Sequence, residues 1–298
     1  MKQKTVFKVS ALLLGLALIA VLGCVSSPKK VDKVGLQLWS VRGEMQNDFE
    51  GTLAAIANAG YDQVEFAGYY DRDPVQIKGL LDSLGLTAPA AHVGYDLLTG
   101  DNLGKTIADA KALGHEYLIL PSLPRLKPPP PLKPGEKPHW EKPKPPTMEE
   151  VHKYVEILDD LGKACHNAGL KFAFHNHVGE FALVDSNEVM YDILLKETDP
   201  EFVQFEMDLG WAIVAGADPI SYLKKYPGRF PYLHVKDMNE ENHSVVVGQG
   251  KINFASILAV ASKNGTTHYI VEYEGREDPM ASVAASVKYL KTMALSNE

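Results

Sequence analysis

The sequence predicts a single-domain, closed parallel (β/α)8 barrel, and two observations support that prediction. From Val34 onward, eight short segments rich in β-branched and aromatic residues alternate with amphipathic segments of helical periodicity. The chain has 298 residues, and one such barrel needs about 250. An open doubly wound sheet is the alternative, but no expected strand is followed by a GxGxxG or GxxxxGK[ST] nucleotide-binding turn.

The expected strands are 34–41, 63–67, 88–93, 117–121, 171–177, 203–208, 232–236 and 269–273. Between them lie expected helices such as 49–59, 74–84, 103–113 and 148–168. Thr147 followed three residues later by Glu150 predicts a capping box for the last of these. Glycines at the positions of left-handed helix ends mark further boundaries: Gly60, Gly85, Gly114, Gly169 and Gly265.

A proline-rich loop, residues 124–147, is inserted after the fourth strand and holds ten of the 19 prolines. Such a run favours an extended polyproline conformation. Its position places it at the carboxyl ends of the strands, where barrel active sites lie. Two interpretations stay open: a solvated loop or partner-docking tract, and a lid that brings Arg125, His139 or Trp140 to the substrate.

The N-terminus has the pattern of a secretory signal, residues 1–23. Three lysines precede the uncharged apolar run 11–23, which is shorter than the roughly 20 residues that span a bilayer. Val21-Leu22-Gly23-Cys24 resembles the bacterial lipobox, which predicts lipidation of Cys24. Residues 24–33 would be a tether and 34–298 the barrel, facing the periplasm or on the outer membrane of a bacterial envelope. A plain signal peptide is the alternative.

The charge balance argues against nucleic acid as a partner. Thirty Lys and Arg stand against 38 Asp and Glu, and without residues 1–23 the net charge falls from −8 to −11. A nucleic-acid-binding surface needs basic groups to neutralise phosphates. The only cysteines, Cys24 and Cys165, cannot build a disulfide framework.

Imidazoles and carboxylates stand at or just past six of the strand ends. They are Glu65, His92, His175, His177, Glu180, Glu206, Asp208, His234, Asp237, Glu272 and Glu274. Because parallel strands of a barrel end at one mouth, these side chains converge there. A set of one His and three carboxylates suits a divalent cation, with Mn²⁺ favoured and Mg²⁺, Zn²⁺ or Co²⁺ as alternatives.

These segments resemble the xylose isomerase-like barrels, which include sugar isomerases, 3-epimerases, inosose dehydratases and endonuclease IV. The resemblance covers nearly all of the barrel and rests on these motifs: Gly35-Leu36-Gln37-Leu38-Trp39-Ser40, Gly60-Tyr61-Asp62-Gln63-Val64-Glu65, Phe174-His175-Asn176-His177-Val178-Gly179-Glu180-Phe181, Glu206-Met207-Asp208, His234-Val235-Lys236-Asp237, Gly248-Gln249-Gly250-Lys251-Ile252-Asn253-Phe254 and Val271-Glu272.

The resemblance implies one metal held by residues of strands five to eight. Asp208, His234 and Glu272 carry over directly. Many relatives have a Glu where this chain has His175, so Glu180 is the predicted fourth ligand, with His175 or His177 as the alternative. The predicted catalytic residues are His175, His177, Glu272 and Lys236, and the predicted substrate-binding residues are Glu65, His92, Trp211 and Arg125.

The expected activity is metal-dependent isomerisation, epimerisation or elimination on a sugar or keto-sugar, through an enediolate. The His that 3-epimerases place three residues after the strand-six Asp is Trp211 here, which weakens epimerisation and leaves room for the other two. A catalytically silent sugar-binding envelope lipoprotein is the alternative function. An abasic-site endonuclease is opposed by the acidic charge and by the predicted envelope location.

Overall fold

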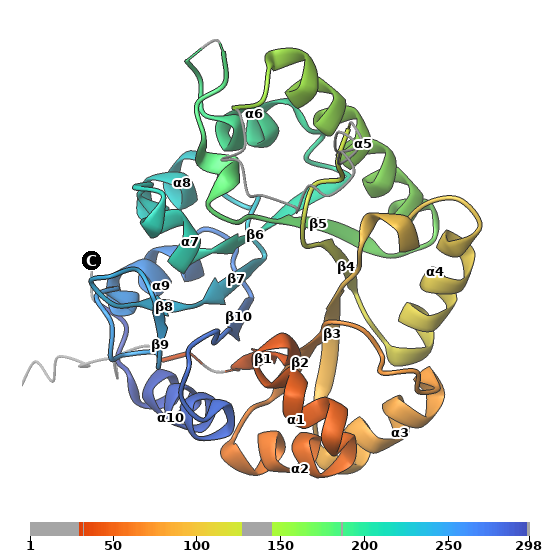
Figure 1. Ribbon diagram of the computed structural model, residues 1–298, viewed down its shortest axis with the longest axis vertical. Helices are drawn as coiled ribbons and strands as arrows, with labels where there is room; N and C mark the ends of the chain where they lie inside the picture. Colours follow the sequence, from red (N-terminus) through yellow and green to blue (C-terminus); the bar gives the residue numbers. More distant parts are fainter. Residues whose placement is uncertain (1–29, 32, 127–144, 186, 297–298) are drawn as a thin grey trace, which may run out of the picture.

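The computed structural model describes residues 30–31, 33–126, 145–185 and 187–296, which form one closed barrel (Figure 1). Eight parallel strands pair in the order β1-β10-β7-β6-β5-β4-β3-β2, and β1 closes the ring against β2. The predicted (β/α)8 barrel is confirmed. Its strands are β1 Gly35–Gln37, β2 Gln63–Phe66, β3 Thr87–His92, β4 Tyr117–Leu120, β5 Lys171–His175, β6 Val203–Asp208, β7 Tyr232–Val235 and β10 His268–Val271.

Helices surround the barrel on its outer side (Figure 1). They are α1 Arg42–Asn47, α2 Phe49–Ala59, α3 Pro74–Leu84, α4 Asn102–Leu113, α5 Met148–Asn167, α6 Met190–Glu197, α7 Leu209–Val214, α8 Pro219–Lys225, α9 Phe254–Lys263 and α10 Pro279–Thr292. A short antiparallel hairpin, β8 Asp237–Met238 with β9 Ser244–Val245, forms a separate sheet. Among the described residues, no helix has both the length and the apolar character that a membrane span requires.

Local capping sets the ends of several helices where the sequence predicts them. The Thr147 hydroxyl accepts a hydrogen bond from the Glu150 amide at 3.3 Å, and the Glu150 carboxylate accepts one from the Thr147 amide at 3.1 Å. This is the expected capping box of α5. Gly60, Gly85 and Gly114 end α2, α3 and α4 in the left-handed conformation that a side chain disfavours.

The first strand is shorter than the predicted range 34–41. β1 ends at Gln37, and a 3-10 turn, Leu38–Val41, follows it. The side-chain oxygen of Gln37 accepts a hydrogen bond from the Trp39 amide at 3.0 Å, which stabilises the turn. The apolar residues that indicated a longer strand are instead buried within the turn, whereas Trp39 lies 45% exposed.

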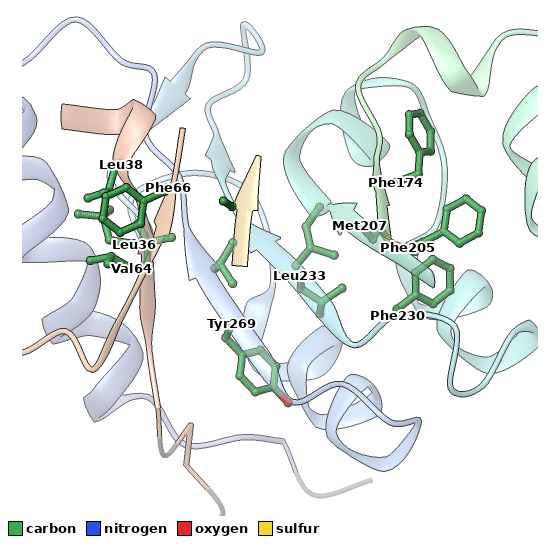
Figure 2. Close-up of a cluster of buried hydrophobic side chains, with 14 of the residues drawn as sticks. Leu36, Leu38, Val64, Phe66, Phe174, Phe205, Met207, Phe230, Leu233 and Tyr269 are labelled. Atoms are coloured by element: carbon green, nitrogen blue, oxygen red, sulfur yellow. The ribbon is translucent and has the colours of Figure 1, made fainter. Parts of the chain in front are cut away.

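Each strand divides its side chains between two faces, because successive residues of a strand point in opposite directions. One face packs against the helices in a large apolar cluster; Figure 2 shows part of it, including Leu36, Phe66, Phe205 and Leu233. The other face fills the barrel interior with a smaller cluster: Ala90, Tyr117, Ile119, Ala173, Tyr232 and Ile270. Further along the strands, the interior positions become polar.

Three predictions concern residues outside the described part of the chain. These are the signal segment 1–23 with the lipidated Cys24, most of the tether 24–33, and residues 127–144 of the proline-rich loop. They stay predictions, as does the division of the chain at residue 34.

Candidate metal centre at the mouth of the barrel

Four strands carry an apolar interior residue followed, two positions later, by an imidazole or a carboxylate. The pairs are Ala90 and His92 of β3, Ala173 and His175 of β5, Tyr232 and His234 of β7, and Ile270 and Glu272 at the end of β10. Because alternate residues of a strand face the same side, each polar residue lies above the apolar interior layer. The polar layer therefore forms at the carboxyl ends of the strands, the end at which barrel active sites lie.

One buried group at this end has the composition of a cation site. Its members are His175, Asp208, His234 and Glu272, and one ligand atom from each lies within 4.8 Å of the others. The His234 Nδ1 lies 2.9 Å from Glu272 Oε2 and 4.0 Å from Asp208 Oδ2. The structure thus brings together Asp208, His234 and Glu272, the three residues that the sequence assigns to a metal, and adds His175.

Asp208 has a carboxylate oxygen available for a cation. Its Oδ1 accepts a hydrogen bond from the Trp211 amide at 2.8 Å, where it caps α7. Its Oδ2 is buried and makes no hydrogen bond, although Lys236 Nζ lies 3.1 Å away. Buried carboxylate oxygens are normally satisfied, and mixed imidazole and carboxylate donors suit Mn²⁺, Zn²⁺ and related ions. The four residues fit a divalent cation.

Lys236 places a buried positive charge beside this group. Its ammonium lies 2.9 Å from Glu272 Oε2 and donates a hydrogen bond to Glu274 Oε2 at 2.7 Å. Burial opposes its charge, but the carboxylates of Asp208 and Glu272 raise its pKa above the ordinary lysine value. Burial also opposes ionisation of Glu272, yet Lys236 and His234 lower the pKa of that carboxyl well below its usual value. Both groups are therefore charged at neutral pH.

Glu180, the predicted fourth ligand, lies apart from the four. It stands in the 3-10 turn Gly179–Phe181, and its Oε2 accepts a hydrogen bond from the His177 amide at 2.8 Å. It belongs to neither group of candidate ligands found among the described residues. β5 ends at His175, so His175 still points into the barrel. Glu180 lies beyond the strand, and its carboxylate contacts the backbone of His177.

A second group lies on the other side of His175 and His234. Here His92, Glu206 and the two shared histidines again bring four ligand atoms within 4.8 Å of one another. Glu206 Oε2 lies 2.7 Å from His92 Nε2, 3.0 Å from His175 Nδ1 and 3.2 Å from His234 Nε2. Glu65 Oε1 lies 2.9 Å from His234 Nε2.

Charge is distributed unevenly in this second group. Burial disfavours a charged His92, but Glu65 and Glu206 more than offset it and raise the pKa of His92 to about 9. Burial likewise disfavours a charged Glu65, but His92 and His234 lower its pKa below the usual range. Burial and the charge of Glu65 raise the pKa of Glu206. Glu206 at 2.7 Å and Glu65 at 3.0 Å from His92 Nε2 thus stabilise the protonated form of this imidazole.

A cavity of about 500 Å³, which we call the central cavity, opens directly beside these groups. Its lining includes His92, His175, His177, Glu272 and Glu274, together with Trp39, Ala67, Gly94, Pro121 and Ser122. This volume falls in the range of roughly 300–1,000 Å³ typical of small-molecule sites. A substrate in the cavity can therefore contact the imidazoles and the Glu272 carboxylate directly.

The other predicted substrate-binding residues lie in different positions. His92 lines the central cavity, but Glu65 is fully buried and hydrogen-bonded to Gln37 and His234, so it supports the site from behind. Trp211 lines a neighbouring cavity. Arg125 is exposed in the segment after β4 and is not among the residues that line the central cavity.

Two contributors to the site were given no role in the sequence analysis, although the sequence places one of them, Glu206, at the barrel mouth. Glu206 lies two positions before Asp208, so strand alternation places both carboxylates on the inner face of β6. The other contributor, Gln37, donates a hydrogen bond to Glu65. The sequence does not indicate this contact, because the two residues belong to separate motifs.

Asp237, which follows Lys236 in the His-Val-Lys-Asp motif, has a structural role. Its Oδ2 accepts hydrogen bonds from the Gly248 and Gly250 amides, both at 2.9 Å. A Cβ atom at Gly250 would lie 2.2 Å from Asp237 Oδ1, so only glycine fits there. The motif residues Asp237 and Gly248-Gln249-Gly250 therefore hold the loop after β9 against the barrel.

Fold and site together define a parallel barrel with a candidate His, Asp and Glu metal-binding cluster at its mouth. Residues 53–293 match the family described as Xylose isomerase-like TIM barrel, and this chain belongs to that family.

Its relatives include sugar-modifying enzymes. An inosose dehydratase from Bacillus cereus (strain AH820) is 28% identical over 236 residues, which cover 74% of this chain and 72% of the relative. The crystal structure of a sugar phosphate isomerase/epimerase from Parabacteroides distasonis ATCC 8503 shares 28% identity with a TM-score of 0.70, covering 92% of this chain and 98% of that chain. A D-allulose 3-epimerase from Methylomonas sp., in complex with D-allulose, is 15% identical with a TM-score of 0.63 over 89% of this chain and 98% of that chain, a likeness of fold.

Proposed function

We propose that this chain is a metal-dependent enzyme that removes a proton next to the carbonyl group of a sugar or keto-sugar, acting as an isomerase, an epimerase or a dehydratase. The observation that carries the proposal is the buried group His175, Asp208, His234 and Glu272 beside the central cavity. Relatives named for inosose dehydration and for sugar phosphate isomerisation or epimerisation support the same substrate class.

His175, Asp208, His234 and Glu272 would hold the cation. A divalent ion at this position, of which Mn²⁺ is the first candidate, would act as a Lewis acid on the substrate carbonyl and stabilise the enediolate. The residues around it supply the remaining chemistry. Lys236, predicted as a catalytic residue, is buried and lines neither the central cavity nor its neighbour. Its ammonium lies within 3.1 Å of the Asp208, Glu272 and Glu274 carboxylates, so it would offset their charge and hold them in position.

His177 is the best placed base. It lines the central cavity, it is in neither group of candidate ligands among the described residues, and burial lowers its pKa below the usual histidine value. Its imidazole is therefore neutral at pH 7 and can accept a proton from the substrate carbon. Glu272, ionised and lining the same cavity, is the carboxylate that can exchange a proton elsewhere on the substrate.

The proposed function is tested by proton exchange with solvent. The Mn²⁺-loaded protein would be incubated in D₂O with free aldoses, ketoses, 3-keto sugars and a keto-inositol, and followed by NMR. Deuterium should enter the carbon next to the carbonyl, and a chelator should stop the exchange. Binding of a sugar without exchange would instead support the silent sugar-binding protein.

Glu206 is expected to orient two of the metal-binding imidazoles. It contacts His175 Nδ1 and His234 Nε2, which leaves the opposite ring nitrogen of each histidine to face a cation. Such carboxylate partners fix the tautomer of a ligating histidine, and losing one costs about 10- to 100-fold in metal affinity. Glu206→Gln should therefore weaken Mn²⁺ binding by that factor, measured by competition with a chelator. The exposed Glu201→Gln is the control, and unchanged affinity in both variants would show that Glu206 does not orient the ligands.

We also propose that the chain is anchored in a bacterial envelope through lipid on Cys24. The lipobox-like segment Val21-Leu22-Gly23-Cys24 supports this proposal. Two or more acyl chains give stable membrane attachment. Cys24→Ala should move the protein from the membrane fraction to the soluble periplasmic fraction on cell fractionation, whereas Cys165→Ala should not. Persistent membrane association of the Cys24 variant would contradict lipidation at this site.

A further inference from the structure

A second cavity of about 410 Å³, which we call the side cavity, lies next to the central cavity and is not used by the proposed reaction. It lies between the segment 242–249, which includes β9, and the segment 273–277 after β10. Figure 1 shows β8 and β9 beside β7 and β10, at the edge of the barrel mouth. Its volume also falls in the range of roughly 300–1,000 Å³ typical of ligand sites.

The two cavities are neighbours that share a wall. Glu274 lines both of them. Trp211 lines the side cavity, and its ring lies 6.3 Å from the ring of His177, which lines the central cavity. Lys236 reaches this wall from the candidate metal centre, since its Nζ lies 2.7 Å from Glu274 Oε2 and 4.8 Å from the Trp211 ring centroid. The exposed Glu274 therefore stands between the two cavities, and a ligand that extends past it would occupy both.

The walls of the side cavity are tied together by hydrogen bonds and close packing. The Glu274 amide donates to the Ser244 hydroxyl at 3.0 Å, which joins the segment after β10 to β9. The Tyr273 hydroxyl accepts from the Glu277 amide at 3.1 Å, and a Cβ atom at Gly275 would lie 2.2 Å from that hydroxyl. The cavity is therefore preformed rather than assembled by the ligand.

The lining of the side cavity has the chemistry of a carbohydrate site. Trp211 supplies a half-buried aromatic ring, on which the C–H face of a pyranose can pack, while Tyr273 is a buried part of the wall. Asn242, Gln249 and Arg276 supply side chains that hydrogen-bond to hydroxyl groups. Arg276 is exposed and has no hydrogen-bond or ion-pair partner within the described part of the chain, so its donors are available to a ligand.

We infer that the side cavity binds a second sugar unit, and that the substrate is a disaccharide or a glycoside of similar size whose reacting ring occupies the central cavity. This inference rests on the proposed function for the identity of the reacting ring. The side cavity itself is defined by geometry and by its lining, so the two can be tested separately.

The test compares glucose with cellobiose, maltose and trehalose as probes, by calorimetric titration of the Mn²⁺-loaded full chain. At least one disaccharide should bind about tenfold more tightly than glucose, which corresponds to about 1.4 kcal/mol. Arg276→Ala and Gln249→Ala should reduce that advantage to about threefold or less and leave glucose affinity unchanged. Lys288→Ala, which removes a positive charge from the exposed side of α10, is the matched control and should retain the full advantage.

Two results would overturn the inference: no disaccharide binds more tightly than glucose, or both variants keep the full advantage. Solvent exchange on a monosaccharide without any disaccharide advantage would uphold the proposed function and reject the side cavity as a sugar site. A disaccharide advantage lost in the Arg276 and Gln249 variants, without exchange on any substrate, would uphold the cavity and reject the enzyme activity.

Discussion

Asp208→Asn and His234→Ala are each expected to yield protein without a stoichiometric divalent cation and with turnover reduced by about 10³-fold or more. The Asp208 carboxylate offers a buried oxygen without a hydrogen bond, and an amide replaces its charge with a neutral group. His234 is fully buried and lies within 3 Å of both Glu65 and Glu272. Metal content by elemental analysis and turnover by NMR are the measurements.

Asp208→Asn is the more informative of the two variants, because it preserves shape. The Asn side-chain oxygen can still accept from the Trp211 amide and cap α7. His234→Ala instead leaves buried carboxylates without their positively charged partner, and this destabilises the fold whether or not a metal is bound. The exposed His152→Ala on α5 is the control for loss of a histidine. Full metal occupancy in Asp208→Asn would remove Asp208 from the ligand set.

His175 and Glu180 give opposite expectations in the same experiment. His175→Gln should lower metal content, since His175 lies in the group of candidate ligands. Glu180→Gln should keep its metal, because its carboxylate faces the His177 amide. If Glu180→Gln is metal-poor and His175→Gln is metal-replete, Glu180 is the fourth ligand.

The barrel could be predicted from the sequence because its signals are repeated along the chain. Eight apolar segments alternate with amphipathic ones, and capping residues such as Thr147 mark where helices begin. The convergence of Asp208, His234 and Glu272 follows from the same regularity, since all three stand where an inward-facing strand position reaches the mouth. Strand period and barrel closure are sufficient to bring them together.

The choice between His175 and Glu180 could not be made in this way, because it depends on where β5 ends. The strand stops at His175, and Asn176 then hydrogen-bonds to the backbone of Asp208, accepting from its amide at 3.1 Å. Beyond it, Glu180 lies in the 3-10 turn Gly179–Phe181, where its carboxylate accepts a hydrogen bond from the His177 amide. A sequence pattern specifies the direction of a side chain within a strand but not beyond its end.

The contacts behind the candidate metal centre could not be predicted from the sequence either. Glu65, His92 and Glu206 come from three strands, and their mutual distances depend on the stagger of strands around the barrel. Alternation predicts that each faces inward but not which pairs meet. The first strand shows a related effect: β1 ends at Gln37, whose side chain accepts a hydrogen bond from the Trp39 amide, and a turn takes the place of the predicted residues 38–41.

His177→Gln is expected to retain its metal and to lose about 10²- to 10⁴-fold in the rate of solvent exchange at the substrate carbon, the usual contribution of a general base. His177 lines the central cavity without belonging to the group of candidate ligands. Glutamine has a similar size and can hydrogen-bond, but it cannot accept a proton. The effect should therefore appear in the exchange rate and not in metal content.

The imidazole ring of His177 also lies 4.9 Å from that of His175, so a perturbed metal site is the main competing cause of lost activity. Metal titration separates the two causes. If the His177→Gln protein keeps its full metal content but exchanges the substrate proton slowly, His177 is the base, because the Lewis acid is then intact. A protein with full metal content and unchanged exchange would move the proton transfer to Glu272, an ionised carboxylate in the lining of the same cavity.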